Sequence, residues 1–124
     1  EKAAAEAALA AARQACAELD RLNAMPPAEI AAIAGWHPLR TGIALHDGEV
    51  FFGNVGAPAR LDFTVIGRAV NAASRVEALS KSLGRSILIT EAVAGRLDRP
   101  LDDLGRHALR GVAQPIALFS PPLA

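Results

Sequence analysis

The first 23 residues repeat their apolar positions at the spacing of a helix. Ala, the residue with the highest helix propensity, occupies most of the free positions. We predict one helix from residue 1 to about residue 23, and Met25-Pro26-Pro27 ends it because a proline disfavours helix in the residue before it. A second short helical turn is expected at residues 28–34. The predicted apolar stripe of the long helix consists of Leu9, Arg13, Cys16, Leu19 and Leu22.

Alternation of apolar and polar residues predicts strands in the middle of the chain. Residues 39–46 alternate, and the Asp47-Gly48 dipeptide that follows is well suited to a tight type I′ turn. The residues after the dipeptide read as the returning strand. We therefore predict a β-hairpin over residues 39–55, in which Gly53 marks a bulge or a close approach of another backbone.

The second half combines one amphipathic helix with short strands. A strand over residues 63–66 leads through a glycine into a helix over residues 67–83, and Gly84 is placed to end that helix. The apolar stripe of this helix consists of Ala69, Ala72, Val76, Leu79 and Leu83. The remaining elements are a buried strand at residues 86–89, a brief helix capped by Thr90 that runs through Leu97, and strands near residues 107–109 and 116–119.

Length and composition narrow the class of protein. A chain of 124 residues can build one domain with its own core, and its formal net charge of zero, without a basic stripe, argues against nucleic acid as a partner. The single cysteine, Cys16, excludes an intramolecular disulfide and fits a reducing compartment. Because no apolar run is long enough for a membrane span, we expect a cytoplasmic chain whose membrane contacts, if any, come from regions outside these residues.

The chain begins in helical rhythm, with neither Met nor an N-cap residue ahead of the first alanines. We expect it to be part of a longer protein whose N-terminus lies upstream.

Asn71 and Arg75 are the most distinctive pair of polar residues. Four positions apart on a helix, they lie on neighbouring turns of one face and can address a single ligand. A planar guanidinium grips phosphate oxygens, and an amide can donate or accept beside it. Spacing alone favours the simpler interpretation of two solvated polar residues on an exposed helix face, so the surrounding sequence has to decide.

That context resembles the catalytic domain of class III nucleotidyl cyclases, the adenylate and guanylate cyclase family. The resemblance rests on residues 60–75, in which a strand and a glycine precede the Asn-x-x-x-Arg helix, and on residues 42–50 and 105–111. It implies an α+β, ferredoxin-like nucleotidyl cyclase fold whose N-terminal strands are missing, so that residues 1–124 are the C-terminal part of the domain. The implied reaction converts ATP to cyclic AMP and pyrophosphate at the interface of a homodimer, in intracellular signal transduction.

The resemblance also implies roles for single residues. Asn71 would orient the ribose, and Arg75 would hold the α-phosphate as charge gathers on it in the transition state. Thr64, seven residues before Asn71, would read the base, which favours ATP over GTP while leaving the choice partly open. Arg110 would reach the β- and γ-phosphates, although an exposed arginine at a strand end is an equally good account of that residue.

Metal binding is the part of the family's machinery that this sequence does not match. The family uses two Mg²⁺ or Mn²⁺ ions, held by two Asp residues on strands that precede the helix at the start of this chain. Asp62 belongs to the matched motif, and we expect Asp98, Asp102 and Asp103 in a late loop, so no metal ligand is assigned here. His37, His46 and His107 lack the spacing of a zinc site, and we assign His46 a structural role.

Two other interpretations remain open at this point. The chain could belong to a non-catalytic cyclase-like module that regulates or dimerises with a partner, and the upstream sequence would distinguish the two by the presence or replacement of the metal-binding Asp residues. An unrelated ferredoxin-like binding domain would require the matched motifs to be coincidental.

Overall fold

The computed structural model describes residues 1–60 and 62–123. Its helices and strands, in chain order, are α1 (Lys2–Ala24), α2 (Ala28–Ala31), β1 (Ile43–Leu45), β2 (Phe51–Val55), the 3₁₀ turn η1 (Pro58–Arg60), β3 (Asp62–Ile66), α3 (Arg68–Glu77), α4 (Ser80–Leu83), β4 (Ile87–Thr90), α5 (Glu91–Ala94), β5 (Asp102–His107) and β6 (Ile116–Ser120). The α+β class expected from the sequence is confirmed.

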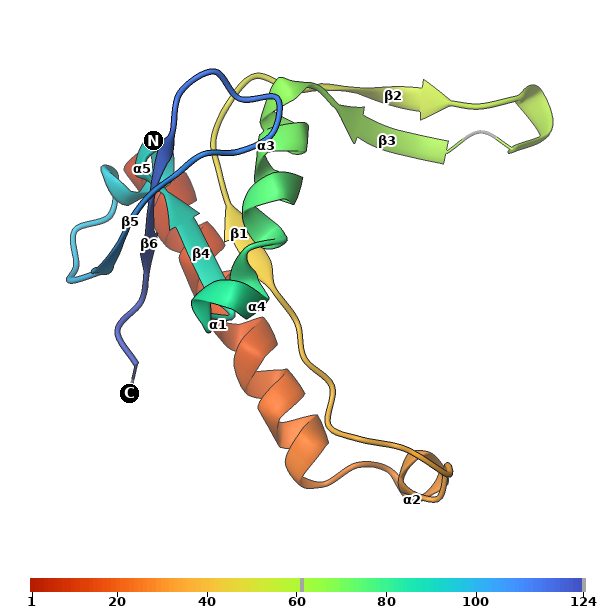
Figure 1. Cartoon of the computed structure of the whole chain (residues 1–124). Coiled ribbons are helices and arrows are strands. Elements are labelled where there is room, and N and C mark those ends of the chain that lie inside the picture. Colours follow the sequence, from red (N-terminus) through yellow and green to blue (C-terminus); the bar gives the residue numbers. More distant parts are fainter. Residues whose placement is uncertain (61, 124) are drawn as a thin grey trace.

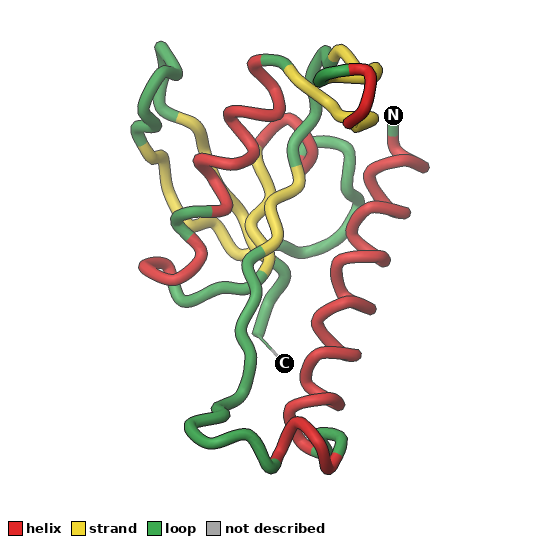
Figure 2. The backbone as a smooth tube through the Cα atoms, turned by 90° about the vertical axis from the view of Figure 1, so that its right-hand side faces the viewer, coloured by secondary structure: helices red, strands yellow, loops and turns green. Residues whose placement is uncertain are grey.

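A four-stranded sheet forms the centre, in the order β1-β4-β6-β5. β1 runs parallel to β4, and β6 is antiparallel to both β4 and β5. Helix α1 covers one face of this sheet and α3 the other (Figure 2). Strands β2 and β3 pair only with each other and project from the body as a two-stranded arm (Figure 1).

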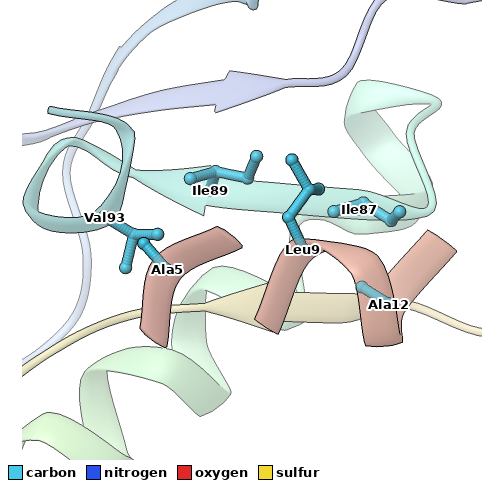
Figure 3. Packing of buried hydrophobic residues seen from close by; sticks show 6 residues of the cluster. All are labelled: Ala5, Leu9, Ala12, Ile87, Ile89 and Val93. Atoms are coloured by element: carbon cyan, nitrogen blue, oxygen red, sulfur yellow. The ribbon is translucent and has the colours of Figure 1, made fainter. Parts of the chain in front are cut away.

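Strand β4 is the centre of the core because both of its faces are covered. All four of its residues are buried, which explains its unbroken apolar sequence. Ile87 and Ile89 pack against Leu9 of α1 (Figure 3), whereas Leu88 packs against Val76 of α3. Alternate residues of one strand therefore join the two helices to the same sheet.

The long first helix is confirmed, and it ends one residue beyond the expected position. Its buried face differs from the predicted stripe, since Ala5 and Ala12 are buried with Leu9 while Arg13 is exposed. Small side chains form the contact because they let the helix lie close to β4.

The hairpin predicted for residues 39–55 is wrong. Its first half, β1, pairs in parallel with β4, and its second half, β2, pairs with β3 further along the chain. Asp47-Gly48 does redirect the chain, but it carries it from the central sheet into the arm. Glycine is needed there because a Cβ at Gly48 would lie 2.7 Å from the Cβ of Ala69 in α3.

The proposed bulge or close approach at Gly53 is also wrong. Gly53 lies opposite Thr64 in an uninterrupted β2–β3 register, and a Cβ at this glycine would meet nothing within 4 Å.

The helix predicted over residues 67–83 is divided in two. Helix α3 ends at Glu77 in a tight turn in which the Leu79 amide donates to the Val76 carbonyl at 2.9 Å, and α4 then begins at Ser80. The apolar period continues across the break because Leu79 and Leu83 pack on the same core as Val76. Gly84 ends α4 in the left-handed conformation, as expected.

Of the last two strands, β6 lies where it was predicted and β5 does not. Strand β5 covers Asp102–His107, so Asp102 and Asp103 lie in a strand and not in a loop. This strand is at the edge of the sheet and pairs only with β6, which accounts for its polar sequence. The helix that follows Thr90 is also shorter than expected, since α5 ends at Ala94.

Candidate functional site

A hollow of about 1030 Å³ lies beside α3, between the segment that follows β1 and the turn that precedes β6. The residues on its wall that carry polar or charged side chains are His46, Glu49, Arg68, Asn71, Arg75 and Arg110. Three of the four site residues expected from the sequence, Asn71, Arg75 and Arg110, therefore share one concave surface.

Helix α3 presents Asn71 and Arg75 together because its opposite side is anchored in the core. Ala72 and Val76, each one position further along the helix, are buried against the sheet, while Asn71 and Arg75 are exposed. The pair therefore lies on a face of α3 that the core leaves open. Both side chains are thus available to a ligand or to another subunit.

Arg110 reaches the same hollow from a distant part of the sequence. Its neighbour Leu109 is buried in the cluster that contains Val76 of α3, and the Val112 amide donates to the Leu109 carbonyl at 3.1 Å to close a turn. Leu109 therefore anchors the turn beside α3, and Arg110 lies on the open side of that anchor.

Thr64 lies outside this hollow. It is half-buried in β3, opposite Gly53, within the arm. The structure thus brings Asn71, Arg75 and Arg110 together within the chain and leaves Thr64 apart from their common surface.

The hollow carries arginine side chains that form no ion pair within the described residues. Arg85, Arg96, Arg99 and Arg106 form ion pairs elsewhere. The three guanidiniums on the wall of the hollow, those of Arg68, Arg75 and Arg110, make no ion pair or hydrogen bond with the side chains that the structure describes. Such an arrangement suits a polyanion, because a planar guanidinium pairs with phosphate oxygens.

His46 and Arg68 also line the hollow, although no ligand role was expected for either residue. Arg68 could have been identified, because it lies on the same helical face as Asn71 and Arg75. His46 could not have been identified from the sequence, because the pairing of β1 with β4 is what brings it to the hollow. Its Nδ1 shares a hydrogen bond of 2.8 Å with Oγ1 of Thr90, at the end of the neighbouring strand β4.

Thr90 also occupies the N-cap of α5, as the sequence predicted. Its side chain makes no capping hydrogen bond there and bonds instead with the imidazole of His46.

The pKa of His46 is lowered from its ordinary value of 6.5, mainly because burial disfavours the charged imidazolium, while the neighbouring Asp47 carboxylate opposes the shift. With a lower pKa in the folded state, the unfolded chain binds more protons below pH 6.5. His46 therefore makes folding less favourable as the pH falls from 6.5 through its folded pKa.

We expect the free energy of unfolding to drop less between pH 7 and pH 5 for His46→Asn than for the unsubstituted protein. Chemical denaturation at both pH values measures this difference. His37→Asn, at an exposed histidine, is the matched control and should retain the full drop. If the free energy of unfolding of His46→Asn fell by the same amount as that of the unsubstituted protein, the pH dependence would come from other groups.

Carboxylates do not gather into a metal site in this part of the protein. In residues 1–60 and 62–123, no three His, Cys, Asp or Glu side chains are close enough together to hold a metal ion. Asp102 is paired with Arg85 at 2.7 Å, and Oδ1 of Asp103 accepts from the Gly105 amide at 2.8 Å. The described residues therefore do not fit a two-metal centre.

No helix within the described ranges is long and apolar enough to cross a membrane.

Comparisons with known proteins agree with the fold and with the matched motifs. A family model described as the adenylate and guanylate cyclase catalytic domain matches residues 6–118. The adenylate cyclase of Anabaena cylindrica is 52% identical over 62 residues, which are 50% of this chain and 12% of that protein. An uncharacterized protein of Mycobacterium tuberculosis is 42% identical over 119 residues, which are 92% of this chain and 19% of that protein. Adenylate cyclase 1 of Rhizobium meliloti is 40% identical over 86 residues, 69% of this chain and 13% of that protein.

Two solved structures are similar to the chain over part of their length. The adenylyl cyclase CyaB from P. aeruginosa aligns with a TM-score of 0.51 and 31% identity, over 60% of this chain and 38% of that one. A bacterial light-regulated adenylyl cyclase aligns with a TM-score of 0.51 and 30% identity, over 60% of this chain and 22% of that one. The expected cyclase fold is confirmed.

The chain spans about a fifth or less of the length of these curated relatives. Within that span, the family model covers most of the residues and includes Thr64, Asn71, Arg75 and Arg110. The chain belongs to the adenylate and guanylate cyclase catalytic domain family.

Proposed function

We propose that residues 1–124 form the C-terminal part of an adenylate cyclase domain and supply the nucleotide-binding half of its active site. The observation that carries this proposal is the shared hollow. Asn71 and Arg75 on α3 and Arg110 on a distant turn line it together, with guanidiniums that no described side chain neutralises. The reaction would convert ATP to cyclic AMP and pyrophosphate, in intracellular signal transduction within the cytoplasm.

Arg75 is assigned to the α-phosphate. Cyclisation builds negative charge on that phosphate as the ribose oxygen attacks, and a guanidinium presented by α3 beside the phosphate stabilises that charge. Asn71, one turn away, can donate and accept beside it, and we assign it to the ribose. Arg110 lines the same hollow, from the turn between β5 and β6, and is assigned to the β- and γ-phosphates.

Thr64 is assigned to the base, and its hydroxyl can donate to or accept from adenine. Since Thr64 lies in the arm and outside the hollow, this role requires the arm and a further part of the full protein to border the base. We propose ATP as the substrate in preference to GTP, with the remaining base-reading residue outside this chain.

The metal ions of the reaction are assigned to ligands outside this chain, because the described residues do not fit a two-metal centre. When bound, two Mg²⁺ or Mn²⁺ ions would activate the attacking hydroxyl and neutralise phosphate charge. We propose that a second subunit contributes their carboxylates, so that each active site of a homodimer is shared.

The arm provides the surface that such a dimer needs. Phe51 and Phe52 of β2 are 62% and 70% exposed, and their cross-strand neighbours Ile66 and Val65 of β3 are 55% and 43% exposed. Successive residues of a strand point to opposite sides, so both faces of the arm are apolar. Exposed apolar surface of this kind marks an interaction site, and we assign it to the second subunit.

Val65→Glu is expected to weaken the dimer of the full-length protein about tenfold or more, since it places a charge in the apolar contact. Sedimentation equilibrium measures the dissociation constant. Ile33→Glu is the matched control, because Ile33 is 58% exposed and lies outside the arm. Equal dissociation constants for the two variants would show that the arm does not join the subunits.

The activity itself is tested by incubating the full-length protein with ATP, or with GTP, in the presence of Mn²⁺ and measuring cyclic nucleotide. We expect cyclic AMP from the full-length protein and no product from the 124-residue chain alone. Product from the isolated chain would contradict the assignment of the metal ligands. A full-length protein that dimerises and binds ATP but forms no product would instead support the regulatory module.

A further inference from the structure

His46 is a half-buried titratable group that the proposed reaction does not use. It follows β1, and its imidazole reaches across to Thr90 at the end of β4. Thr90 pairs with Leu118, which belongs to the core cluster on the α3 side of the sheet. The imidazole therefore lies on the same side of the sheet as α3, and it forms part of the wall of the hollow that Arg75 and Arg110 share.

The hydrogen bond to Thr90 fixes which ring nitrogen carries the proton. Thr90 is 1% exposed, and among the described residues His46 is the only hydrogen-bond partner of its hydroxyl. A buried hydroxyl whose proton had no acceptor would be costly, so the Thr90 hydroxyl donates to Nδ1. The neutral imidazole must then carry its proton on Nε2.

Nε2 is accessible to a ligand. It makes no hydrogen bond with the described residues. Among those residues, every buried side-chain nitrogen or oxygen has a hydrogen-bond partner, so an unbonded Nε2 must be exposed to solvent. Because the imidazole lies on the α3 side of the sheet and His46 lines the hollow there, an Nε2–H that is neither bonded nor buried can donate to an acceptor within that hollow.

We propose that His46 is a further phosphate ligand of the active site, whose Nε2–H, oriented by the Thr90 hydroxyl, donates a hydrogen bond to the polyphosphate of the nucleotide and of the pyrophosphate product. This inference rests on the proposed function. The hollow supplies the remaining charge complementarity, since Arg68, Arg75 and Arg110 line it with Glu49 as the carboxylate beside them, and Asp47 is paired with Arg96 at 2.9 Å.

Two substitutions separate the two nitrogens of the ring. Asn places a polar atom near the position of Nδ1 and has nothing at the position of Nε2, so His46→Asn keeps a partner for Thr90 and removes the donor. Gln extends further and places its amide near the position of Nε2, so His46→Gln restores the donor.

Binding of pyrophosphate to the full-length protein, measured by titration calorimetry, tests the proposal without requiring turnover. We expect His46→Asn to weaken binding about tenfold, and His46→Gln to remain within about threefold of the unsubstituted protein. His37→Asn should leave binding unchanged. Thr90→Val, which keeps the ring but removes the hydroxyl that orients it, should weaken binding as well.

Wild-type affinity in both His46→Asn and Thr90→Val would overturn the proposal, as would equal losses in His46→Asn and His46→Gln at unchanged thermal stability. If the unsubstituted protein binds neither pyrophosphate nor ATP, the proposed function fails. If it binds both and produces cyclic AMP while His46→Asn binds normally, only the role of His46 is rejected.

Discussion

Replacing Arg75 by Ala in the full-length protein is expected to lower kcat about 100-fold or more, which corresponds to about 2.7 kcal/mol of lost transition-state stabilisation. The guanidinium interacts most strongly when charge has accumulated on the α-phosphate, so its loss should appear mainly in kcat and much less in the affinity for ATP. The side chain is exposed, so the fold should not depend on it.

Steady-state kinetics and a thermal unfolding curve together test this expectation. Arg13→Ala is the matched control, since Arg13 is an exposed arginine on the other long helix, α1. It should leave both kcat and KM unchanged. An Arg75→Ala enzyme with normal kcat and a raised KM would show that Arg75 contributes uniform binding to substrate and transition state, and our assignment of its role would then be wrong.

Local pattern was sufficient to predict much of α3 and its exposed pair. Buried Ala72 and Val76 recur at the helical period, and any helix with that stripe must leave Asn71 and Arg75 on another face. The break at residues 78–79 was not predictable in the same way, because Leu79 continues the apolar period into α4.

Strand pairing was the part that the sequence could not decide. Asp47-Gly48 is compatible both with a tight hairpin and with an exit from the central sheet, and alternation in residues 39–46 does not name the partner of that strand. The partner of β1 is β4, a strand more than 40 residues away, because β4 is fully buried and needs a neighbouring strand on each side. The same long-range effect places His46 beside Thr90, 44 residues away, and brings it into the hollow.

The motif around Arg110, at residues 105–111, suggested its role as a phosphate ligand, whereas only the structure shows how it reaches the hollow. The strand before it was expected near residues 107–109 and in fact ends at His107. Leu109 is buried although it lies in a turn, and this anchor places Arg110 at the hollow beside α3. The placement thus depends on core packing that no local pattern around Arg110 reveals.

Mixing two inactive variants is expected to restore activity if each active site is shared between subunits. One variant carries Arg75→Ala, and the other lacks the metal-binding carboxylates that we place outside this chain. Neither homodimer contains a complete site, so each should be nearly inactive on its own. In the heterodimer, the subunit with intact carboxylates faces the subunit with an intact Arg75, which completes one of the two sites.

The expected recovery follows from random pairing. Equal amounts of the two subunits give half of the dimers as heterodimers, each with one working site of two, so activity should reach about a quarter of the unsubstituted value in a two-fold symmetric dimer. Cyclic AMP formation by the mixture after subunit exchange measures it, with each variant alone as the control. Val65→Glu in both subunits should reduce the recovery at concentrations below the dissociation constant of that variant, because the arm that we assign to the interface would join them more weakly. Heterodimers that form, as shown by differently tagged subunits, and yet produce no cyclic AMP would exclude a shared site and would place Arg75 and the metal ligands in separate functions.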